Sequence, residues 1–173
     1  MRNNTLSIYK MMILYMLDRV DFELSTSQLS EFIVGKGYTN FFNFQQALNE
    51  LEGKAFVRSR SIRNASHYKI EKSGRDTLKY FGDDLSEAIK REIDDYLISN
   101  ELSLRKQSEN VADYYRERAG HYIVTCSAKD HGEPIINMTL NVEDEDMAIA
   151  MCDNWQRKYA DLYSYIIHEL IRR

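Results

Sequence analysis

Residues 39–81 of this 173-residue chain constrain its fold most, because one helix pattern and two strand patterns follow each other in a short stretch. Thr39 is a typical helix-capping residue, and apolar residues recur after it at helical spacing. The stripe expected to be buried comprises Phe41, Phe44, Leu48 and Leu51. The opposite face carries the amides Asn43, Gln46 and Asn49, flanked by Phe42 and Glu50. Residues 39–51 are therefore predicted to form an amphipathic helix with an amide-rich outer face.

Two short strand-like runs follow this helix, at residues 56–62 and 67–70. They are joined by Arg63-Asn64-Ala65-Ser66, a composition that is typical of turns. This arrangement predicts a β-hairpin. The chain then leaves the second strand and is expected to enter another helix that reaches at least residue 78.

Positive charge is concentrated in the same region. Residues 1–82 hold 12 Lys and Arg against 8 Asp and Glu, whereas the rest holds 11 against 19, although the whole chain has a net charge of −4. Residues 54–79 alone contain eight basic and two acidic residues. A basic hairpin beside an amide-rich helix is the arrangement expected of a surface that faces nucleic acid. A solvated, charged hairpin without a ligand is the alternative interpretation.

At these residues the chain resembles the PadR and MarR groups of bacterial winged-helix regulators. Their motif runs roughly L-x-x-L-E-x-x-G and two hydrophobic residues, a basic wing, then Y-x-L-T-x-x-G-R-x-x-L. The first part is matched by Leu48, Leu51, Glu52, Ala55, Phe56 and Val57, and the second by Tyr68, Ile70, Glu71, Gly74, Arg75 and Leu78. Two positions differ, since Ala55 stands where Gly is usual and Glu71 stands where Thr usually caps the next helix.

Taken whole, the chain resembles an uncharacterised Gram-positive bacterial family of unknown function that begins with such a winged helix. The resemblance covers residues 5–82. It implies a winged helix-turn-helix DNA-binding domain over residues 1–82 and a C-terminal α+β domain for dimerisation or sensing over residues 83–173. For the C-terminal half it implies no known chemistry.

In a winged helix-turn-helix the second helix of the motif docks in the major groove, where its outward residues meet base edges. Amide side chains pair well with adenine, so the candidate base contacts are Asn43, Gln46 and Asn49. Phe42 is expected to pack against a neighbouring helix rather than to touch a thymine methyl group. Contacts to the DNA backbone are expected from the wing residues Arg58, Arg60, Arg63 and Lys69.

Two further helices are expected before this stretch. Residues 6–20 are apolar nearly all round, which predicts a helix that is buried on more than one side and leaves one side for a dimer partner. Residues 26–35 begin with Thr and Ser, contain Glu31 and end at Gly35, as a short helix would. This helix would be the first of the helix-turn-helix, with residues 36–38 as its turn.

The second half is predicted to contain a sheet and long helices. Asp83 or Asp84 can cap a helix through Leu97, which would serve dimerisation or support its own domain, and residues 103–111 are a connector or its end. Strand-like runs at 112–118, 121–129 and 135–142 predict a three-stranded antiparallel meander with one wet face. A helix over 144–171 should cover it with Met147, Met151, Trp155, Tyr159, Leu162, Ile166 and Leu170. The predicted fold class is therefore α+β.

Residue patterns for catalysis are missing from the sequence. In the C-terminal half the histidines His121, His131 and His168 lack metal-ligand spacing, and no nucleophile elbow or phosphate loop is found, so neither an enzyme nor a cofactor is expected. The acidic run 143–146 fits a helix N-terminus, with a cation as the alternative. Cys126 and Cys152 are expected as small apolar residues, with a redox switch as the alternative. The aromatic residues Tyr114, Tyr115, Tyr122, Trp155 and Tyr159 are expected in the core, or else around an unknown small-molecule effector.

These observations favour a cytoplasmic, homodimeric protein that binds double-stranded DNA and regulates transcription. The most apolar run, residues 11–17, is shorter than the roughly 18 residues of a spanning helix, and no signal peptide precedes it, so no membrane partner is expected. A protein-interaction module on a winged-helix scaffold is the main alternative, because the predicted recognition helix lacks Lys and Arg and the chain is acidic overall. An enzyme that uses the C-terminal half is a third hypothesis.

Overall fold

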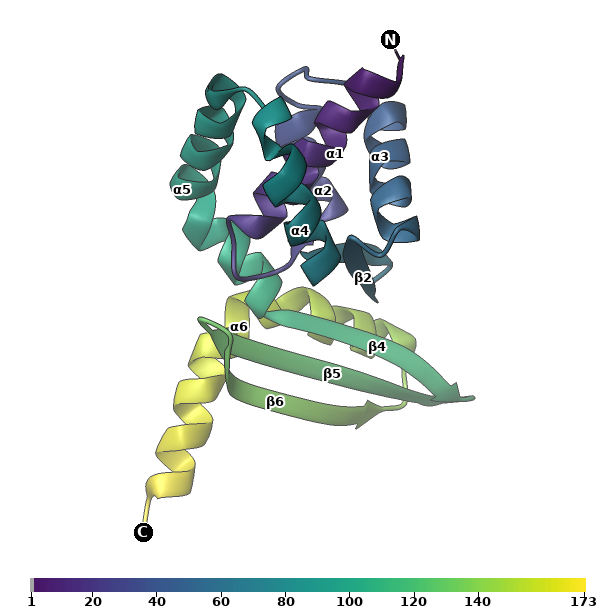
Figure 1. The fold of residues 1–173 in the computed structure, drawn as a ribbon. Helices are drawn as coiled ribbons and strands as arrows, with labels where there is room; N and C mark the ends of the chain where they lie inside the picture. The colour runs from purple at the N-terminus through teal and green to yellow at the C-terminus, as the bar shows by residue number, and fades with distance from the viewer. Residues whose placement is uncertain (1) are drawn as a thin grey trace. The chain divides into compact units, whose positions relative to one another are not determined.

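The computed structural model describes residues 2–173 and has an α+β fold with two three-stranded antiparallel sheets (Figure 1). Its elements follow in the order α1 (Arg2–Asp18), β1 (Leu24–Ser25), α2 (Thr26–Ile33), α3 (Phe41–Gly53), β2 (Val57–Ile62), β3 (Ala65–Ile70), α4 (Lys72–Phe81), a 3-10 turn (Gly82–Asp84), α5 (Glu87–Glu109), β4 (Val111–Arg118), β5 (His121–Asp130), β6 (Glu133–Val142) and α6 (Glu145–Ile171). This order agrees with the predicted succession of helices and strands.

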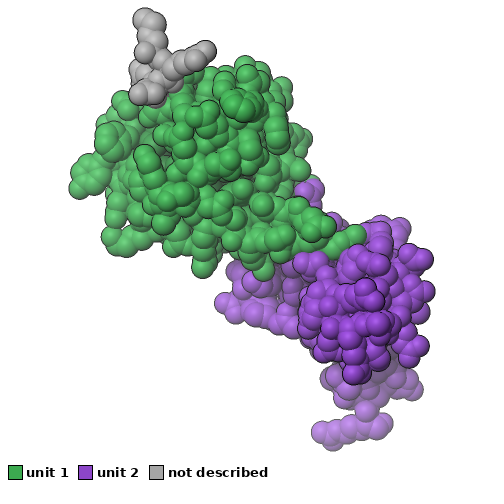
Figure 2. Space-filling model, turned by 90° about the vertical axis from the view of Figure 1, so that its right-hand side faces the viewer, with its two compact units in different colours: residues 1–104 green, residues 105–173 purple. Residues whose placement is uncertain are grey.

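The chain forms two compact units, residues 1–104 and 105–173, which Figure 2 shows in green and purple. The expected domain boundary after residue 82 lies inside the first unit. Residues 83–104 belong there because Leu85, Ile93, Leu97 and Leu104 are buried in the core of the first unit. The last turn of α5 belongs to the second unit.

Helix α1 is the centre of the first core. The side chains of Met12, Ile13, Leu14 and Met16 are fully buried, and Leu17 is 2% exposed. They pack with residues of α2, α3, β3 and α5 in one continuous cluster. The expectation that a dimer partner covers one side of this helix is therefore wrong for its middle turns, because this chain itself supplies the cover on every side.

Helix α5 is fixed to the first unit by polar contacts as well as by its buried residues. The Tyr15 hydroxyl donates to Asp94 at 3.1 Å, and Arg19 Nε donates to the same carboxylate at 2.9 Å. The Tyr38 hydroxyl donates to Glu92 at 2.7 Å, and burial together with this carboxylate raises the pKa of Tyr38 to about 12. Helix α5 was expected either to mediate dimerisation or to support its own domain. These contacts agree with the second role.

The start of α5 differs from the prediction. Asp83 and Asp84 lie in the 3-10 turn instead of capping the helix, and α5 begins at Glu87. The hydroxyl of Ser86 accepts a hydrogen bond from the Ile89 amide at 3.3 Å and thereby takes the capping position. The tight turn occurs because Leu85 must reach the core, where it is 1% exposed.

The second unit is the predicted meander covered by one helix. Strand β5 lies between β4 and β6, with Val124 opposite both Tyr114 and Leu140. Helix α6 buries Ala148, Cys152 and Trp155 against the sheet. The Trp155 indole N–H donates to the Ser127 carbonyl at 2.9 Å, which satisfies the polar atom of this buried ring. Three residues that were expected on the same stripe are instead exposed, namely Met147 at 53%, Leu162 at 41% and Leu170 at 77%.

Polar groups at the end of α5 bind the turn between β5 and β6. The buried Glu109 carboxylate accepts hydrogen bonds from the Gly132 amide at 2.8 Å and from Arg105 at 3.3 Å. Gly132 has a positive φ of 84°, which glycine adopts without strain. The carboxylate therefore holds the tight turn in place.

None of the helices in residues 2–173 combines the length and the apolar character that crossing a bilayer requires.

Candidate nucleic-acid interface

Helix α3 presents an amide-bearing face to solvent in the first unit. Gln46 and Asn49 are exposed, as the sequence predicted. Along the helix, the Gln46 side chain donates a hydrogen bond to Glu50 at 3.2 Å, and the Asn49 side chain accepts one from Gln45 at 3.3 Å. Gln45 is a further amide on this face that the sequence pattern did not single out. The buried side of α3 consists of Phe44, Ala47, Leu48 and Leu51.

The first turn of α3 corrects three predictions. Asn40 is the N-cap instead of Thr39, and its side-chain oxygen accepts from the Asn43 amide at 2.9 Å. Phe41 is 54% exposed although it was expected in the buried stripe, where Ala47 lies instead. Phe42 was expected to pack against a neighbouring helix, but it is 76% exposed. The buried face of α3 is therefore rotated toward Ala47, a small residue that was not included in the predicted stripe.

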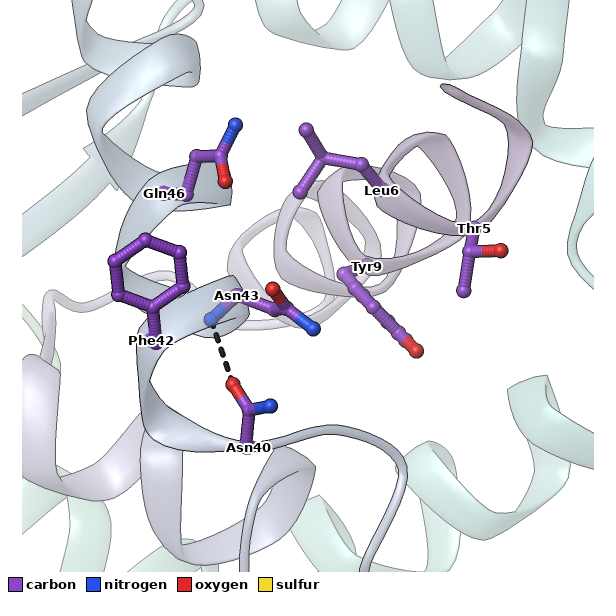
Figure 3. Close-up of a pocket in the computed structure, with 7 residues that line it drawn as sticks. All are labelled: Thr5, Leu6, Tyr9, Asn40, Phe42, Asn43 and Gln46. Atoms are coloured by element: carbon purple, nitrogen blue, oxygen red, sulfur yellow. Dashed lines mark hydrogen bonds between the residues drawn. The ribbon is translucent and has the colours of Figure 1, made fainter. Parts of the chain in front are cut away.

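Asn43 lies at the edge of the exposed face of α3. It is half-buried, and Figure 3 shows its side chain extending from α3 toward Tyr9 of α1. The space between these two helices is a hollow of about 680 Å³. The lining residues are Thr5, Leu6, Tyr9, Asn40, Phe42, Asn43 and Gln46. Two of the three predicted base contacts, Asn43 and Gln46, thus line one hollow, and Asn49 does not.

The position of α3 against α1 is also fixed by an ion pair. Lys10 Nζ lies 2.9 Å from Glu50 Oε2. The hydrogen bonds from Lys10 and from Gln46 hold the pKa of the Glu50 carboxyl below its usual range. The carboxylate of Glu50 on the amide-rich face is therefore partly neutralised within the protein.

The β2–β3 hairpin carries the predicted basic residues. Strand pairing sets Arg58 opposite Lys69 and Arg60 opposite His67. Arg63 and Asn64 form the tip, with φ values of 51° and 60°, so the connection is a two-residue turn and β3 begins at Ala65. The expected four-residue loop is thus too long by two residues, because the turn needs only two residues in the left-handed region.

Acidic partners of the hairpin arginines were not foreseen. Arg58 Nε lies 2.9 Å from Glu71 Oε1, and Arg60 Nε lies 2.7 Å from Glu23 Oε2. The arginine side chains remain 67% and 50% exposed in these pairs. Exposed ion pairs of this kind contribute about 0–1 kcal/mol, so another anion can take the place of either carboxylate at little cost.

His67 lies on the central strand of the β1–β3–β2 sheet, paired with Ser25 on one side and with Arg60 on the other. Its Nδ1 is buried and has no hydrogen-bond partner among the described residues. Burial lowers the pKa of this imidazole, nearby Glu23 raises it and nearby Arg60 lowers it further. The net result is a neutral histidine next to the Arg60–Glu23 pair.

Helix α3 ends in a turn that fixes the direction of the hairpin. The Ala55 amide donates to the Glu52 carbonyl at 2.9 Å and the Phe56 amide donates to the Leu51 carbonyl at 2.9 Å, which are the two bonds of a Schellman motif. Ala55 has a φ of 57°, in the region that favours glycine. Position 55, where glycine was expected from the resemblance, therefore has a left-handed backbone although it carries Ala.

The start of α4 closes on the same turn. The Phe56 carbonyl accepts from the Glu71 amide at 2.9 Å, and the Ala55 carbonyl accepts from the Ser73 hydroxyl at 2.6 Å. Gly74 is buried against this backbone. Glu71 makes no side-chain cap, in agreement with its departure from the usual Thr. The backbone contacts between the end of α3 and the start of α4 thus fix both ends of the hairpin beside the amide-rich helix.

Neither cysteine of the second unit is accessible. Cys126 and Cys152 are both buried in the core between the sheet and α6, as predicted. Burial, together with neighbouring Cys152, raises the pKa of the Cys126 thiol to about 11. A thiol in this environment is a poor nucleophile at neutral pH.

Four of the five aromatic residues that were expected in the core of the second unit pack there, and part of the acidic run caps α6. The rings of Tyr114 and Tyr122 lie 6.4 Å apart at the edge of the core, whereas Tyr115 is 57% exposed. Asp144 caps α6 by accepting from the Asp146 amide at 2.7 Å, which accounts for part of the acidic run. Among residues 2–173 no three His, Cys, Asp or Glu side chains converge as a metal site would require.

These features define an α+β protein of two compact units, whose first unit carries an amide-bearing helix and a basic hairpin joined by a rigid turn. Residues 9–170 match the model of a family described as a domain of unknown function, DUF4364, and the chain belongs to that family. No curated protein and no solved structure matched the chain.

Proposed function

We propose that this protein binds double-stranded DNA in a sequence-specific manner and acts as a transcriptional regulator. In this proposal α2 and α3 form a helix-turn-helix, α3 is its recognition helix, and the β2–β3 hairpin is its wing. The observation that carries the proposal is the fixed connection between the exposed amides of α3 and the arginines of the hairpin. Base readout and phosphate binding need these two kinds of side chain on one rigid surface.

Gln46 and Asn49 are the residues best exposed for base contact, and Asn43 is the third candidate at the edge of the hollow. An amide that forms a good bidentate pair with adenine discriminates by about 1–3 kcal/mol against other bases. Both amides already bond along the helix, so DNA would replace hydrogen bonds of similar strength. The exposed ring of Phe42 is suited to apolar contact with a thymine methyl group.

Phosphate binding would come from Arg58, Arg60, Arg63 and Lys69 of the wing. The carboxylates of Glu71 and Glu23 pair with the guanidinium groups of Arg58 and Arg60 in the absence of DNA. Phosphate would compete with these carboxylates, which reduces the net gain from each contact. The proposed affinity is therefore moderate and strongly dependent on salt.

A second candidate function is that of a protein-interaction module on the same scaffold. The observation that favours it is the pair of exposed aromatic rings at the start of α3, Phe41 and Phe42, on a helix without Lys or Arg. Aromatic residues are enriched at the centres of protein interfaces. The basic hairpin next to them favours DNA instead.

The test is an anisotropy titration of the protein into labelled duplexes, one from the region upstream of its own gene and one of unrelated sequence. We expect tighter binding to the upstream duplex and a linear fall of log K with log salt, with a slope of several ions. Binding that is equally weak for both duplexes at low salt would reject the proposal and favour the protein-interaction module.

A further inference from the structure

The last turns of α6 carry an apolar surface that the second unit does not cover. Seven of the ten residues from 162 to 171 are apolar or aromatic. Within these ten residues, only Glu169 carries a formal charge at pH 7. Exposed fractions are 41% for Leu162, 65% for Tyr165, 42% for Ile167, 77% for Leu170 and 72% for Ile171, and Ile166 between them is half-buried. The first half of the same helix differs, because it buries Ala148, Cys152 and Trp155 against the sheet. Figure 1 shows the C-terminal turns of α6, in yellow, running beyond the strands.

The size of this surface is comparable with what a stable interface needs. Five large side chains at these exposures present on the order of 500 Å² of accessible surface, whereas a standard interface buries about 800 Å² per partner, of which about 65% is apolar in homodimers. The five side chains lie around more than one face of the helix, so a crossing helix would bury part of this surface and other parts of the second copy would cover the rest. The scarcity of charge fits an interface core and disfavours a polyanionic partner.

The spacing along the helix is symmetric about one residue. Leu162 lies four positions before Ile166, and Leu170 lies four positions after it, so the three share one helical face. If two such helices cross in an antiparallel manner at Ile166, each Leu162 meets the Leu170 of the other chain. A face that matches itself under a two-fold rotation is the requirement for an isologous dimer.

We propose that a second copy of this chain covers residues 162–171 of α6, with Ile166 on the two-fold axis of an antiparallel helix pair. This inference rests on the proposed function only in that two recognition helices would then be available for two half-sites. The interface itself needs no DNA. It also provides the dimer contact that the buried middle of α1 does not offer.

Oligomeric state is measured by sedimentation velocity on the full chain without DNA, from about 0.01 to 100 μM, because the dissociation constants of standard-size interfaces extend from the micromolar range downwards. We expect a dimer for the wild type and at least a tenfold weaker association for Leu170→Glu. Leu102→Glu is the matched control, because Leu102 of α5 is 86% exposed but lies outside the surface. It should leave the dimer intact, and circular dichroism should report unchanged helix content for both variants.

A second measurement tests the axis directly. Ile166→Cys should give a disulfide-linked dimer under an added oxidant, because a residue on the axis faces its own copy within the Cα separation of about 4.4–6.8 Å that a disulfide requires. Ser164→Cys, on the other side of the helix, should remain uncrosslinked. A monomeric wild type, a dimer insensitive to Leu170→Glu, or equal crosslinking of both cysteine variants would overturn the proposal. Because no DNA is present, these results do not depend on the test of the proposed function.

Discussion

Gly74 lies so close to the carbonyl oxygen of Phe56 that a Cβ built on Gly74 would be 2.2 Å from that oxygen. The same carbonyl accepts the Glu71 amide, so the start of α4 is pressed against the turn that follows α3. This contact requires glycine for space and not for φ, because any Cβ at position 74 would force the backbone to shift. A single added methyl group at position 74 therefore tests whether the start of α4 lies this close to the turn after α3.

Gly74→Ala should destabilise the protein by about 1–3 kcal/mol, because the added methyl must displace backbone atoms instead of a flexible side chain. The free energy of unfolding from urea denaturation measures the effect. The control is Gly53→Ala in the last turn of α3, where a Cβ would meet no atom within 4 Å. That change should be neutral or stabilise by up to about 1 kcal/mol, since Ala favours helix over Gly. Equal effects at both glycines would contradict the close contact.

Ala55→Gly should act in the opposite direction and stabilise the protein by about 1 kcal/mol, because a left-handed backbone strains residues with a Cβ. The same substitution at Ala88, an exposed position in the first turn of α5, should destabilise by up to about 1 kcal/mol. Urea denaturation measures the free energy of unfolding of both variants, which the same chemical change should raise at position 55 and lower at position 88. A loss of stability for Ala55→Gly would show that the turn does not need the positive φ.

Glu23→Gln should increase the affinity for every duplex, because it releases Arg60 from its 2.7 Å ion pair and removes a negative charge from the wing. An exposed pair is worth up to about 1 kcal/mol, so the gain should be about two- to fivefold at low salt. Glu133→Gln, on β6 in the other unit, changes the net charge equally and should leave the affinity nearly unchanged. Anisotropy with one duplex suffices, and an unaltered affinity for Glu23→Gln would exclude Arg60 from phosphate binding.

Acid should weaken the fold through His67. Burial lowers the pKa of His67 in the folded chain, so the unfolded chain takes up a proton near pH 6.5 while the folded chain still does not. The free energy of unfolding should therefore decrease as the pH falls below about 6.5, down to the lower pKa of the folded state. His67→Gln should reduce this decrease between pH 7.5 and 5.5, as followed by thermal unfolding. The exposed His168→Gln serves as the reference, and an identical pH dependence in all three proteins would contradict the prediction.

The order of elements was predictable because its signals are local. Helical spacing, strand alternation and turn composition located α3, the hairpin and the meander to within a few residues. The orientation of α3 was predicted less well, because Ala47 and Phe41 compete for the buried arc and only packing decides between them. Likewise, the two-residue turn at Arg63 and Asn64 depends on backbone angles that composition does not fix.

The candidate site was predictable in kind but not in its electrostatics. Amides on the outer face of α3 follow from helical periodicity, and both Gln46 and Asn49 are exposed. The ion pairs of Arg60 with Glu23 and of Lys10 with Glu50 join residues 37 and 40 positions apart, so no local pattern could show them. They depend on the tertiary approach of β1 to β3 and of α1 to α3.

The most direct test of DNA recognition compares Gln46→Ala and Arg60→Ala with the wild type on upstream and unrelated duplexes at several salt concentrations. Gln46→Ala should reduce the preference between sequences by about 1–3 kcal/mol while the salt slope stays the same. Arg60→Ala should weaken binding to both duplexes and lower the salt slope by about one ion. Two results would contradict the assignment of α3 as the recognition helix and of the hairpin as the phosphate-binding element. They are an equal loss of affinity for every duplex in both variants, and no measurable DNA binding by the wild type.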